Sequence, residues 1–219
     1  MIFKQLPAAV LWDMDGTLID SEPYWMKSEG AFAKANNSTW TEQDGLSLVG
    51  MSLYDSSKII KEKVGSDLEP EEIIERLTDE VTAQLKQEIF WRPGAKELLL
   101  LLRKKNIKTA LVTMSMHRMA KQVVDSIGFD AFDFIVAGDD VLHGKPHPEA
   151  YLKAAELLGV NPTECVAFED SLSGLRSAEA AGTKAVGIRN IVEIPEQEGR
   201  ILWPTLEGVT ISDLRGLFK

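Results

Sequence analysis

Four short apolar runs in this chain each lead into a polar group, and this pattern limits the possible folds more than any other feature. The runs cover residues 8–12, 109–112, 134–137 and 165–168, and the polar groups that follow them are Asp13, Thr113, Lys145 and the pair Glu169 and Asp170. Apolar runs of four or five residues are typical of buried strands. Because the carboxyl ends of parallel strands open onto one crevice, these polar groups are expected to lie close together.

The chain beyond Pro93 alternates between strand and helix patterns. Predicted helices at 95–105, 118–127, 148–158 and 172–181 separate predicted strands at 109–113, 134–137, 165–168 and 184–186, and a short helix is expected after Ile211. Such alternation implies right-handed crossovers and a parallel sheet. The first strand, at residues 8–12, finds partners only in this part of the chain.

Residues 22–88 contain no convincing strand and have a different pattern. Helical spacing predicts three helices there, at Glu22–Ala35, Tyr54–Val64 and Pro70–Glu88, and Gly45, Gly50 and Gly65 are expected to interrupt the segment. The predicted fold class is therefore α/β, a Rossmann-like core with a parallel sheet and an inserted helical cap domain. The expected boundaries are 1–20 and 92–219 for the catalytic core and 21–91 for the cap, inserted after the first strand.

Net charge and hydropathy limit the kinds of partner that this 219-residue chain can bind. Its net charge of −10 argues against nucleic acid, whose phosphates require a basic surface. The longest apolar runs are far shorter than the roughly 20 residues that a membrane span needs. A single cysteine, Cys165, and an amino terminus without the apolar centre of a secretory signal lead us to expect a cytoplasmic protein. The expected partner is a small metabolite.

Asp13 and Asp15 lie two residues apart at the end of the first strand and are candidate catalytic groups. Two carboxylates this close repel each other unless a cation or a proton lies between them, and Mg²⁺ is the most suitable hard cation for oxygen ligands. Glu169 and Asp170 offer further oxygens, so all four acids are candidate metal ligands. A calcium-binding loop is excluded, because Gly16 is fourth from Asp13 rather than sixth.

Three residues after other strands are candidates for binding an anionic substrate. Lys145, in Gly144-Lys145-Pro146, supplies a fixed positive charge, while Thr113 and Ser115 supply hydroxyl groups at the end of a strand. At 4 Å and an effective dielectric constant of 20, attraction between two unit charges is about 4 kcal/mol. Carboxylates, a cation, a lysine and hydroxyls together are suited to phosphoryl transfer.

Taken in order, these motifs resemble the four signatures of the haloacid dehalogenase superfamily, in its phosphatase-like branch with a helical cap after the first motif. Asp13-Met14-Asp15-Gly16-Thr17-Leu18 is similar to motif one and Glu169-Asp170-Ser171 to motif four, with Thr113 and Lys145 in the positions of motifs two and three. The resemblance covers nearly the whole chain.

The resemblance implies a mechanism. Asp13 would attack phosphorus to form an aspartyl-phosphate, and Asp15 would protonate the leaving group and then activate water. Mg²⁺ would be held by Asp13, the main-chain carbonyl of Asp15 and Asp170, with Glu169 nearby. The implied activity is that of a phosphatase acting on a small phosphomonoester, with a sugar phosphate suggested by analogy.

Relatives with other activities differ from this chain at characteristic positions. The carbon–halogen hydrolases lack the second acid of motif one, which is present here as Asp15, and receiver domains lack that acid and the helical insert. β-Phosphoglucomutase-like enzymes remain the alternative. Those enzymes carry a cap histidine and cationic anchors for a second phosphate, whereas this chain has Trp25, Leu53 and Met116 at the corresponding places. Hydrolysis is therefore favoured over mutase activity.

Overall fold

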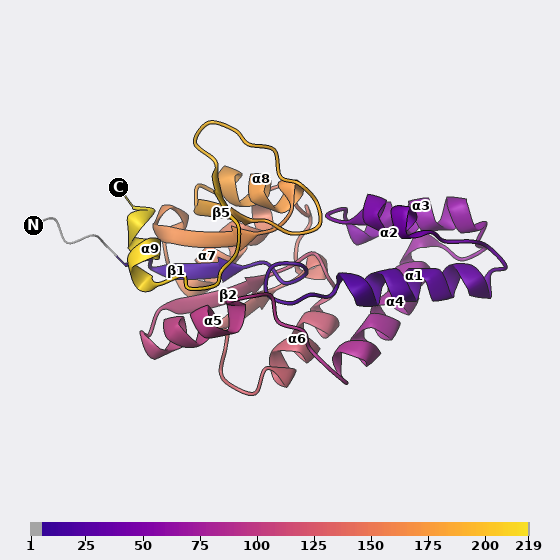
Figure 1. Ribbon diagram of the computed structural model, residues 1–219, viewed down its shortest axis with the longest axis horizontal. Helices are drawn as coiled ribbons and strands as arrows, with labels where there is room; N and C mark the ends of the chain where they lie inside the picture. The colour runs from indigo at the N-terminus through magenta and orange to yellow at the C-terminus, as the bar shows by residue number, and fades with distance from the viewer. Residues whose placement is uncertain (1–5, 219) are drawn as a thin grey trace, which may run out of the picture.

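The computed structural model describes residues 6–218 and contains one six-stranded sheet with helices on both faces (Figure 1). Residues 1–5 and 219 of the predicted core lie outside the described range. The strands are β1 (Ala9–Trp12), β2 (Lys108–Val112), β3 (Phe134–Val136), β4 (Cys165–Glu169), β5 (Lys184–Ile188) and β6 (Ile201–Trp203). The core helices are α5 (Ala95–Lys104), α6 (His117–Ser126), α7 (Glu149–Leu158), α8 (Leu172–Ala180) and α9 (Ile211–Gly216).

All strand pairs are parallel, in the order β3-β2-β1-β4-β5-β6. β1 lies between β2 and β4, and Ala9 pairs with Lys108 on one side and with Cys165 on the other. The carboxyl ends of the three central strands therefore open side by side. This arrangement confirms the predicted fold class and brings three of the four polar strand ends together.

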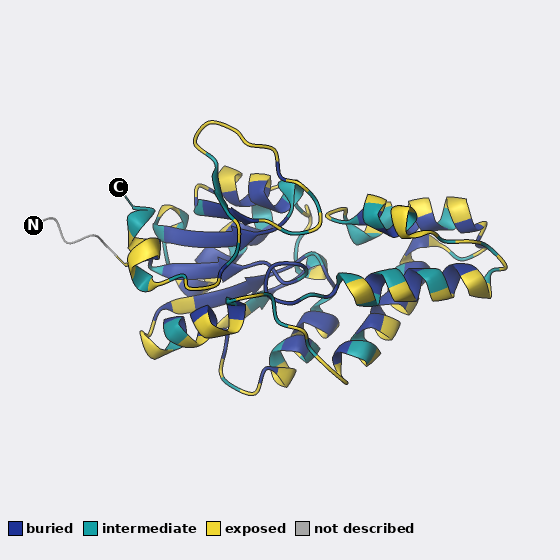
Figure 2. Ribbon diagram, in the orientation of Figure 1, coloured by how far each residue is buried: buried dark blue, intermediate teal, exposed yellow. Residues whose placement is uncertain are grey.

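The two faces of the sheet have separate cores, because successive side chains of a strand point to opposite faces. Val10 and Trp12 of β1 pack in one cluster with residues of α5 and α6. Ala9 and Leu11 pack in the other cluster with residues of α7 and α8. In Figure 2 the central strands are buried, as expected for a parallel sheet covered on both faces, and β1 and β4 are buried along their whole length.

Four helices between β1 and α5 form a group beside the carboxyl end of the sheet (Figure 1). They are α1 (Glu22–Ala35), α2 (Glu42–Leu48), α3 (Leu53–Val64) and α4 (Pro70–Leu85). α1 and α3 both pack against α4, and their apolar faces are buried there. The chain leaves and re-enters the core at adjacent points, because Asp20 N–H donates to Phe90 O (2.7 Å) and Arg92 N–H donates to Leu18 O (3.0 Å).

The helix count in this segment and the edge of the sheet differ from the sequence prediction. Gly45 does not interrupt the chain but lies inside the unpredicted helix α2, where it approaches Met26 and Glu29 closely. The helix predicted to end at Glu88 ends at Leu85. β6 was also missed, because its three residues are all only partly buried. Among the helices of residues 6–218, none combines the length and apolarity required to cross a membrane.

Candidate active site

Lys145 is the centre of an ionic cluster at the carboxyl end of the sheet. Its Nζ lies 2.7 Å from Asp13 Oδ1 and 2.6 Å from Glu169 Oε1, and its side chain is 5% exposed. Burial alone lowers the pKa of this amine, but the adjoining carboxylates of Asp13 and Glu169 raise the pKa of Lys145 above its ordinary value. The lysine is therefore held in the charged form.

The loop that carries Lys145 is fixed at several points. Lys145 Nζ also donates to the carbonyl oxygen of Val112 at the end of β2 (2.9 Å). The Glu149 carboxylate, at the start of α7, accepts hydrogen bonds from Leu142 N–H (2.7 Å) and His143 N–H (3.0 Å). The ammonium group is thus positioned by both backbone and side-chain contacts.

Three buried acids surround this ammonium. Asp13, Glu169 and Asp170 each offer a carboxylate oxygen, and these oxygens lie within 4.8 Å of one another. Burial, followed by repulsion from Glu169, raises the pKa of Asp13 well above its ordinary value. Burial likewise raises the pKa of Asp170 to about 7. One lysine does not compensate three buried carboxylates, and a divalent cation would fit the donor set because its oxygens are hard ligands.

Asp170 is held in place by residues from two other segments. It accepts hydrogen bonds from Asn190 Nδ2 at Oδ2 (2.7 Å) and from Thr17 Oγ1 at Oδ1 (3.4 Å). Gly16 has φ +78°, and a Cβ there would lie 2.0 Å from Asp170 Oδ2. Only glycine therefore allows the loop after β1 to approach this carboxylate.

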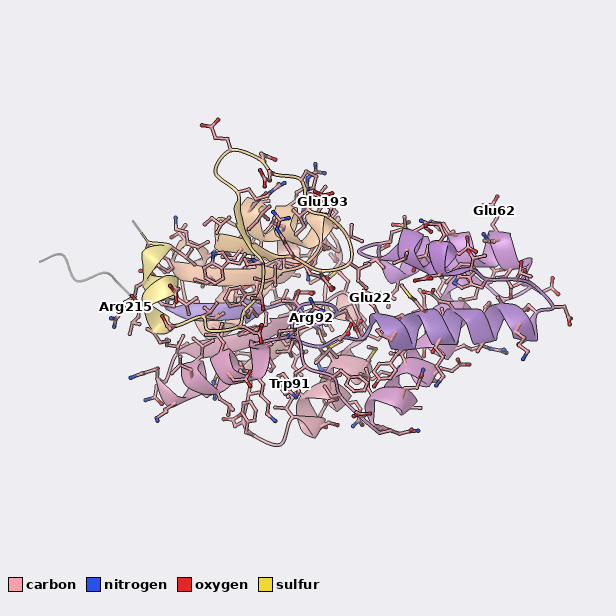
Figure 3. All side chains as sticks on the ribbon, in the orientation of Figure 1. Glu22, Glu62, Trp91, Arg92, Glu193 and Arg215 are labelled. Carbon is pink, nitrogen blue, oxygen red and sulfur yellow. The ribbon has the colours of Figure 1, made fainter. Side chains whose placement is uncertain are left out.

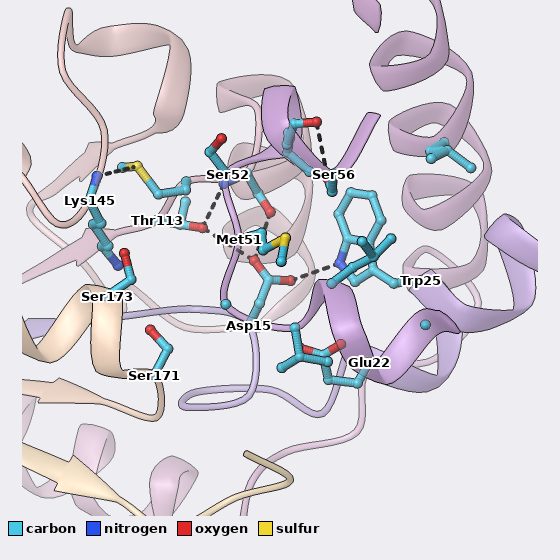
Figure 4. A pocket seen from close by; sticks show the side chains of 18 of the residues that line it. Asp15, Glu22, Trp25, Met51, Ser52, Ser56, Thr113, Lys145, Ser171 and Ser173 are labelled. Atoms are coloured by element: carbon cyan, nitrogen blue, oxygen red, sulfur yellow. Dashed lines mark hydrogen bonds between the residues drawn. The ribbon is translucent and has the colours of Figure 1, made fainter. Parts of the chain in front are cut away.

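Asp15 is not part of the acidic cluster, and its carboxylate, which Figure 4 shows between Thr113 and Trp25, accepts hydrogen bonds from four donors. Its Oδ2 accepts from Ser115 Oγ (2.7 Å) and Thr113 Oγ1 (3.2 Å). Its Oδ1 accepts from Ser21 Oγ (2.5 Å) and from the indole Nε1 of Trp25 in α1 (3.3 Å). This carboxylate therefore connects the end of β2 with the first inserted helix.

A pocket lies between this end of the sheet and the inserted helices (Figure 4). Glu22, Trp25 and Glu29 of α1 line it, opposite Met51 and Ser52 near the start of α3. Figure 3 shows Glu22 at the junction of the two parts of the molecule. Burial, with a contribution from Asp15, raises the pKa of Glu22 to about 8. Carboxyl groups therefore line the pocket well beyond the ionic cluster.

The seven candidate residues from the sequence lie in one region, as two adjoining groups. Asp13, Lys145, Glu169 and Asp170 form the ionic cluster, and Asp15, Thr113 and Ser115 form the hydrogen-bonded group beside it. Six of the seven line the pocket, whereas Glu169 lies behind Lys145.

Sequence reasoning missed three residues that support or extend this site. Tyr151 of α7 donates to Glu169 Oε1 (2.5 Å), Asn190 holds Asp170, and Glu29 lines the pocket. Asn190 follows the end of β5, so the rule that found the other strand-end groups also applies to it. Tyr151 and Glu29 lie on helices and have no comparable signal.

Comparison with known proteins shows the family of this chain. A family model described as haloacid dehalogenase-like hydrolase matches residues 7–182. The "Phosphorylated carbohydrates phosphatase" of Thermotoga maritima is 32% identical, covering 81% of this chain and 83% of that protein. The "Fructose-1-phosphate phosphatase YqaB" of Escherichia coli is 31% identical, covering 83% and 96%. A solved β-phosphoglucomutase from Clostridium difficile shares the fold, with a TM-score of 0.81, 24% identity and coverage of 98% and 97%.

These matches confirm the resemblance that the motifs suggested. Both phosphatases exceed 30% identity over most of their length and of this chain, and the family model covers the inserted helices and the core from β1 to α8. The chain therefore belongs to the haloacid dehalogenase-like hydrolases, in the branch of phosphatases and β-phosphoglucomutase-like proteins, and is a phosphoric monoester hydrolase.

Proposed function

We propose that this hydrolase is a Mg²⁺-dependent phosphatase that cleaves a small phosphomonoester, with a sugar phosphate as the preferred class. The observation that carries the proposal is the ion pair of Lys145 with Asp13 in the wall of the pocket. The lysine Nζ lies 2.7 Å from the Asp13 carboxylate and 2.6 Å from that of Glu169. The curated relatives named above act, by their names, on phosphorylated carbohydrates and fructose 1-phosphate.

The acidic cluster fits a Mg²⁺ ion. We assign Asp13, Asp170 and the main-chain carbonyl of Asp15 as ligands, with Glu169 beside them. The raised pKa values of Asp13 and Asp170 support this assignment, because buried carboxylates that resist ionisation are stabilised as anions by a cation. When bound, Mg²⁺ would supply positive charge to the phosphoryl oxygens and keep these acids ionised.

Asp13 is the proposed nucleophile. Its carboxylate oxygen forms a bond to phosphorus while the bond from phosphorus to the leaving oxygen breaks, which gives an aspartyl-phosphate. Lys145 neutralises the phosphoryl oxygens, and the hydroxyls of Thr113 and Ser115, which donate to Asp15 in this structure, would turn to donate to those oxygens when a phosphoryl group is bound. Water then attacks phosphorus, and Asp13 and inorganic phosphate are released.

Asp15 is the proposed general acid and base. It gives its proton to the leaving alkoxide in the first half-reaction and accepts a proton from the attacking water in the second. Its contacts with Ser21, Trp25, Thr113 and Ser115 support this role, because they orient one carboxylate between the core and the pocket.

Residues 21–91 form the proposed cap, and residues 1–20 and 92–219 form the catalytic core. The paired backbone segments at 18–20 and 90–92 support these boundaries, because both connections cross at one narrow place. Rotation of the cap there would admit substrate and then exclude water. The substrate is a soluble metabolite in this proposal, and a cytoplasmic location remains a prediction.

Release of inorganic phosphate tests the proposal. Sugar monophosphates, nucleotides and an aryl phosphate would be supplied with Mg²⁺ and, in parallel, with a chelator. We expect free sugar and phosphate only when Mg²⁺ is present. An isomerised sugar phosphate whose formation requires a bisphosphate primer would instead identify a mutase, and activity unaffected by chelator would contradict the metal assignment.

A further inference from the structure

Glu29 is a buried acid that the proposed chemistry does not use. The structure buries four carboxylates among residues 6–218, and three of them, Asp13, Glu169 and Asp170, form the ionic cluster. The fourth is Glu29 in α1, which is 6% exposed. It lines the pocket that also contains Asp13 and Asp15. An acid buried in a cleft is expensive unless a partner compensates it, so its surroundings are informative.

The contacts of Glu29 leave one oxygen available. Its Oε2 accepts a hydrogen bond from the indole Nε1 of Trp40 (3.1 Å). None of the hydrogen bonds or ion pairs found among residues 6–218 uses Oε1, and no lysine or arginine lies against this carboxyl. Burial raises the pKa of Glu29 to about 7. The carboxyl is thus oriented by one donor and still has capacity for another.

The pocket around Glu29 has mostly apolar and hydroxyl-bearing walls and is not cationic. A Cβ at Gly45 of α2 would lie 3.2 Å from Glu29 Oε2, so the backbone of α2 packs directly against the carboxyl. Ser52, Ser56 and Ser57 add hydroxyls to the same pocket. The only lysine or arginine that lines the pocket within the described part of the chain is Lys145, which is paired with Asp13 and Glu169.

These side chains are suited to contact the alcohol portion of a phosphate ester, which is the leaving group, rather than a phosphate. Hydroxyl groups of a ligand can donate to the free carboxylate oxygen and exchange hydrogen bonds with the serines. A second phosphate beside Glu22 and Glu29 would find no cationic partner in the pocket lining, so its charge would lose its hydration without compensation. A purely apolar leaving group would leave the buried carboxyl without its second hydrogen bond.

We propose that Glu29 determines specificity by accepting a hydrogen bond from a hydroxyl of the leaving group, so that the pocket selects polyol or sugar monophosphates over alkyl monophosphates and bisphosphates. The inference rests on the proposed phosphatase function, because it concerns the alcohol portion of the same substrate. Trp40 is a positioning residue in this scheme, since it reaches the substrate only through Glu29.

A comparison of two six-carbon substrates tests the role of Glu29. The ratio of kcat/KM for a hexitol monophosphate to that for n-hexyl phosphate would be measured in wild type, Glu29→Leu, Glu29→Gln and Glu62→Gln. We expect the ratio to fall by about 10- to 100-fold in Glu29→Leu, as for loss of a hydrogen bond to a charged or strongly polar group. Glu29→Gln should keep part of the preference, because its amide oxygen still accepts.

Glu62→Gln is the matched control. Glu62 belongs to α3 in the same inserted segment but is exposed and points away from the pocket (Figure 3). This variant should keep the wild-type ratio. Thermal unfolding of every variant would show that altered ratios come from folded protein.

The outcomes separate the inference from the proposed function. An unchanged ratio in Glu29→Leu, with Mg²⁺-dependent release of phosphate from both substrates, would overturn the role of Glu29 and leave the phosphatase assignment intact. Preference of the wild type for a hexose bisphosphate, or for an aminoalkyl phosphate in a Glu29-dependent manner, would overturn the assigned class of leaving group. Failure to release phosphate from any ester would contradict the proposed function itself.

Discussion

At the scale of single residues, the charge balance around Lys145 leads to a prediction for Asp13→Asn. The substitution removes the proposed nucleophile. Because three clustered carboxylates face one ammonium group, it also relieves repulsion from Glu169 and Asp170. Turnover should fall by roughly 10⁴-fold or more. The thermal unfolding midpoint without Mg²⁺ should not decrease, because Lys145 keeps its contact with Glu169. Phosphate release within tenfold of wild type would contradict an aspartyl-phosphate.

Glu29 should make stability depend on pH. Because burial raises its pKa from 4.5 to about 7, ionisation favours the unfolded chain as the pH rises above 4.5, and this penalty is complete above about 7. The free energy of unfolding of wild type, relative to Glu29→Gln, should therefore fall by about 3 kcal/mol between pH 4 and pH 8. Urea unfolding at several pH values measures this difference.

Asp13, Glu22 and Asp170 titrate in both wild type and Glu29→Gln, so their contributions cancel in the difference between the two free energies of unfolding. A difference that stays constant over this pH range would mean that the Glu29 carboxyl is solvated in the folded protein.

The site residues differ in how readily the sequence reveals them. Asp13, Thr113 and Asp170 follow apolar strand runs, and the geometry of a parallel sheet converts that position in the chain into proximity. Tyr151 and Glu29 lie on helices among periodic apolar residues, and their direction depends on how each helix packs. No local pattern distinguishes such a residue from an ordinary one on the face of a helix.

At the scale of secondary-structure elements, α8 and α1 offer a matched pair of glycine substitutions. A Cβ at Gly174 would lie 2.0 Å from Glu169 Oε2, whereas nothing lies within 4 Å of a Cβ at Gly30. Gly174→Ala should displace Glu169 from Lys145 and lower the free energy of unfolding by about 1–3 kcal/mol. Gly30→Ala should raise it by up to about 1 kcal/mol through helix propensity. Urea unfolding compares the two, and equal effects would mean that α8 does not pack against Glu169.

The strands of the core up to β5 were predictable from their apolar runs, whereas β6 and α2 were not predicted. β1, β2 and β4 each contain an unbroken run of three or four apolar residues, which helices on both faces of the sheet bury. β6 has three partly buried residues and depends on pairing with β5. α2 could have been found from its capping box, in which Thr41 and Asp44 exchange hydrogen bonds, but Gly45 obscured it.

At the scale of the whole molecule, Mg²⁺ should stabilise the fold. A cation bound only by the native acidic cluster adds RT ln(1 + [L]/Kd), which is about 2.7 kcal/mol at one hundred times Kd. The thermal unfolding midpoint should therefore rise with Mg²⁺ and return to its starting value with a chelator. Asp170→Asn should lose most of this rise, because it removes one proposed ligand. A similar rise in Asp170→Asn would place the ion elsewhere.

The paired chain segments at 18–20 and 90–92 have an evolutionary consequence. Since the polypeptide departs from the sheet and returns to it through neighbouring backbone positions, one contiguous stretch can be exchanged without rebuilding any strand. Related proteins can therefore keep the same reactive groups in the core and differ in the alcohol portion of the phosphate ester that they accept. Diversification of the family can therefore proceed by replacing an insert instead of redesigning a scaffold.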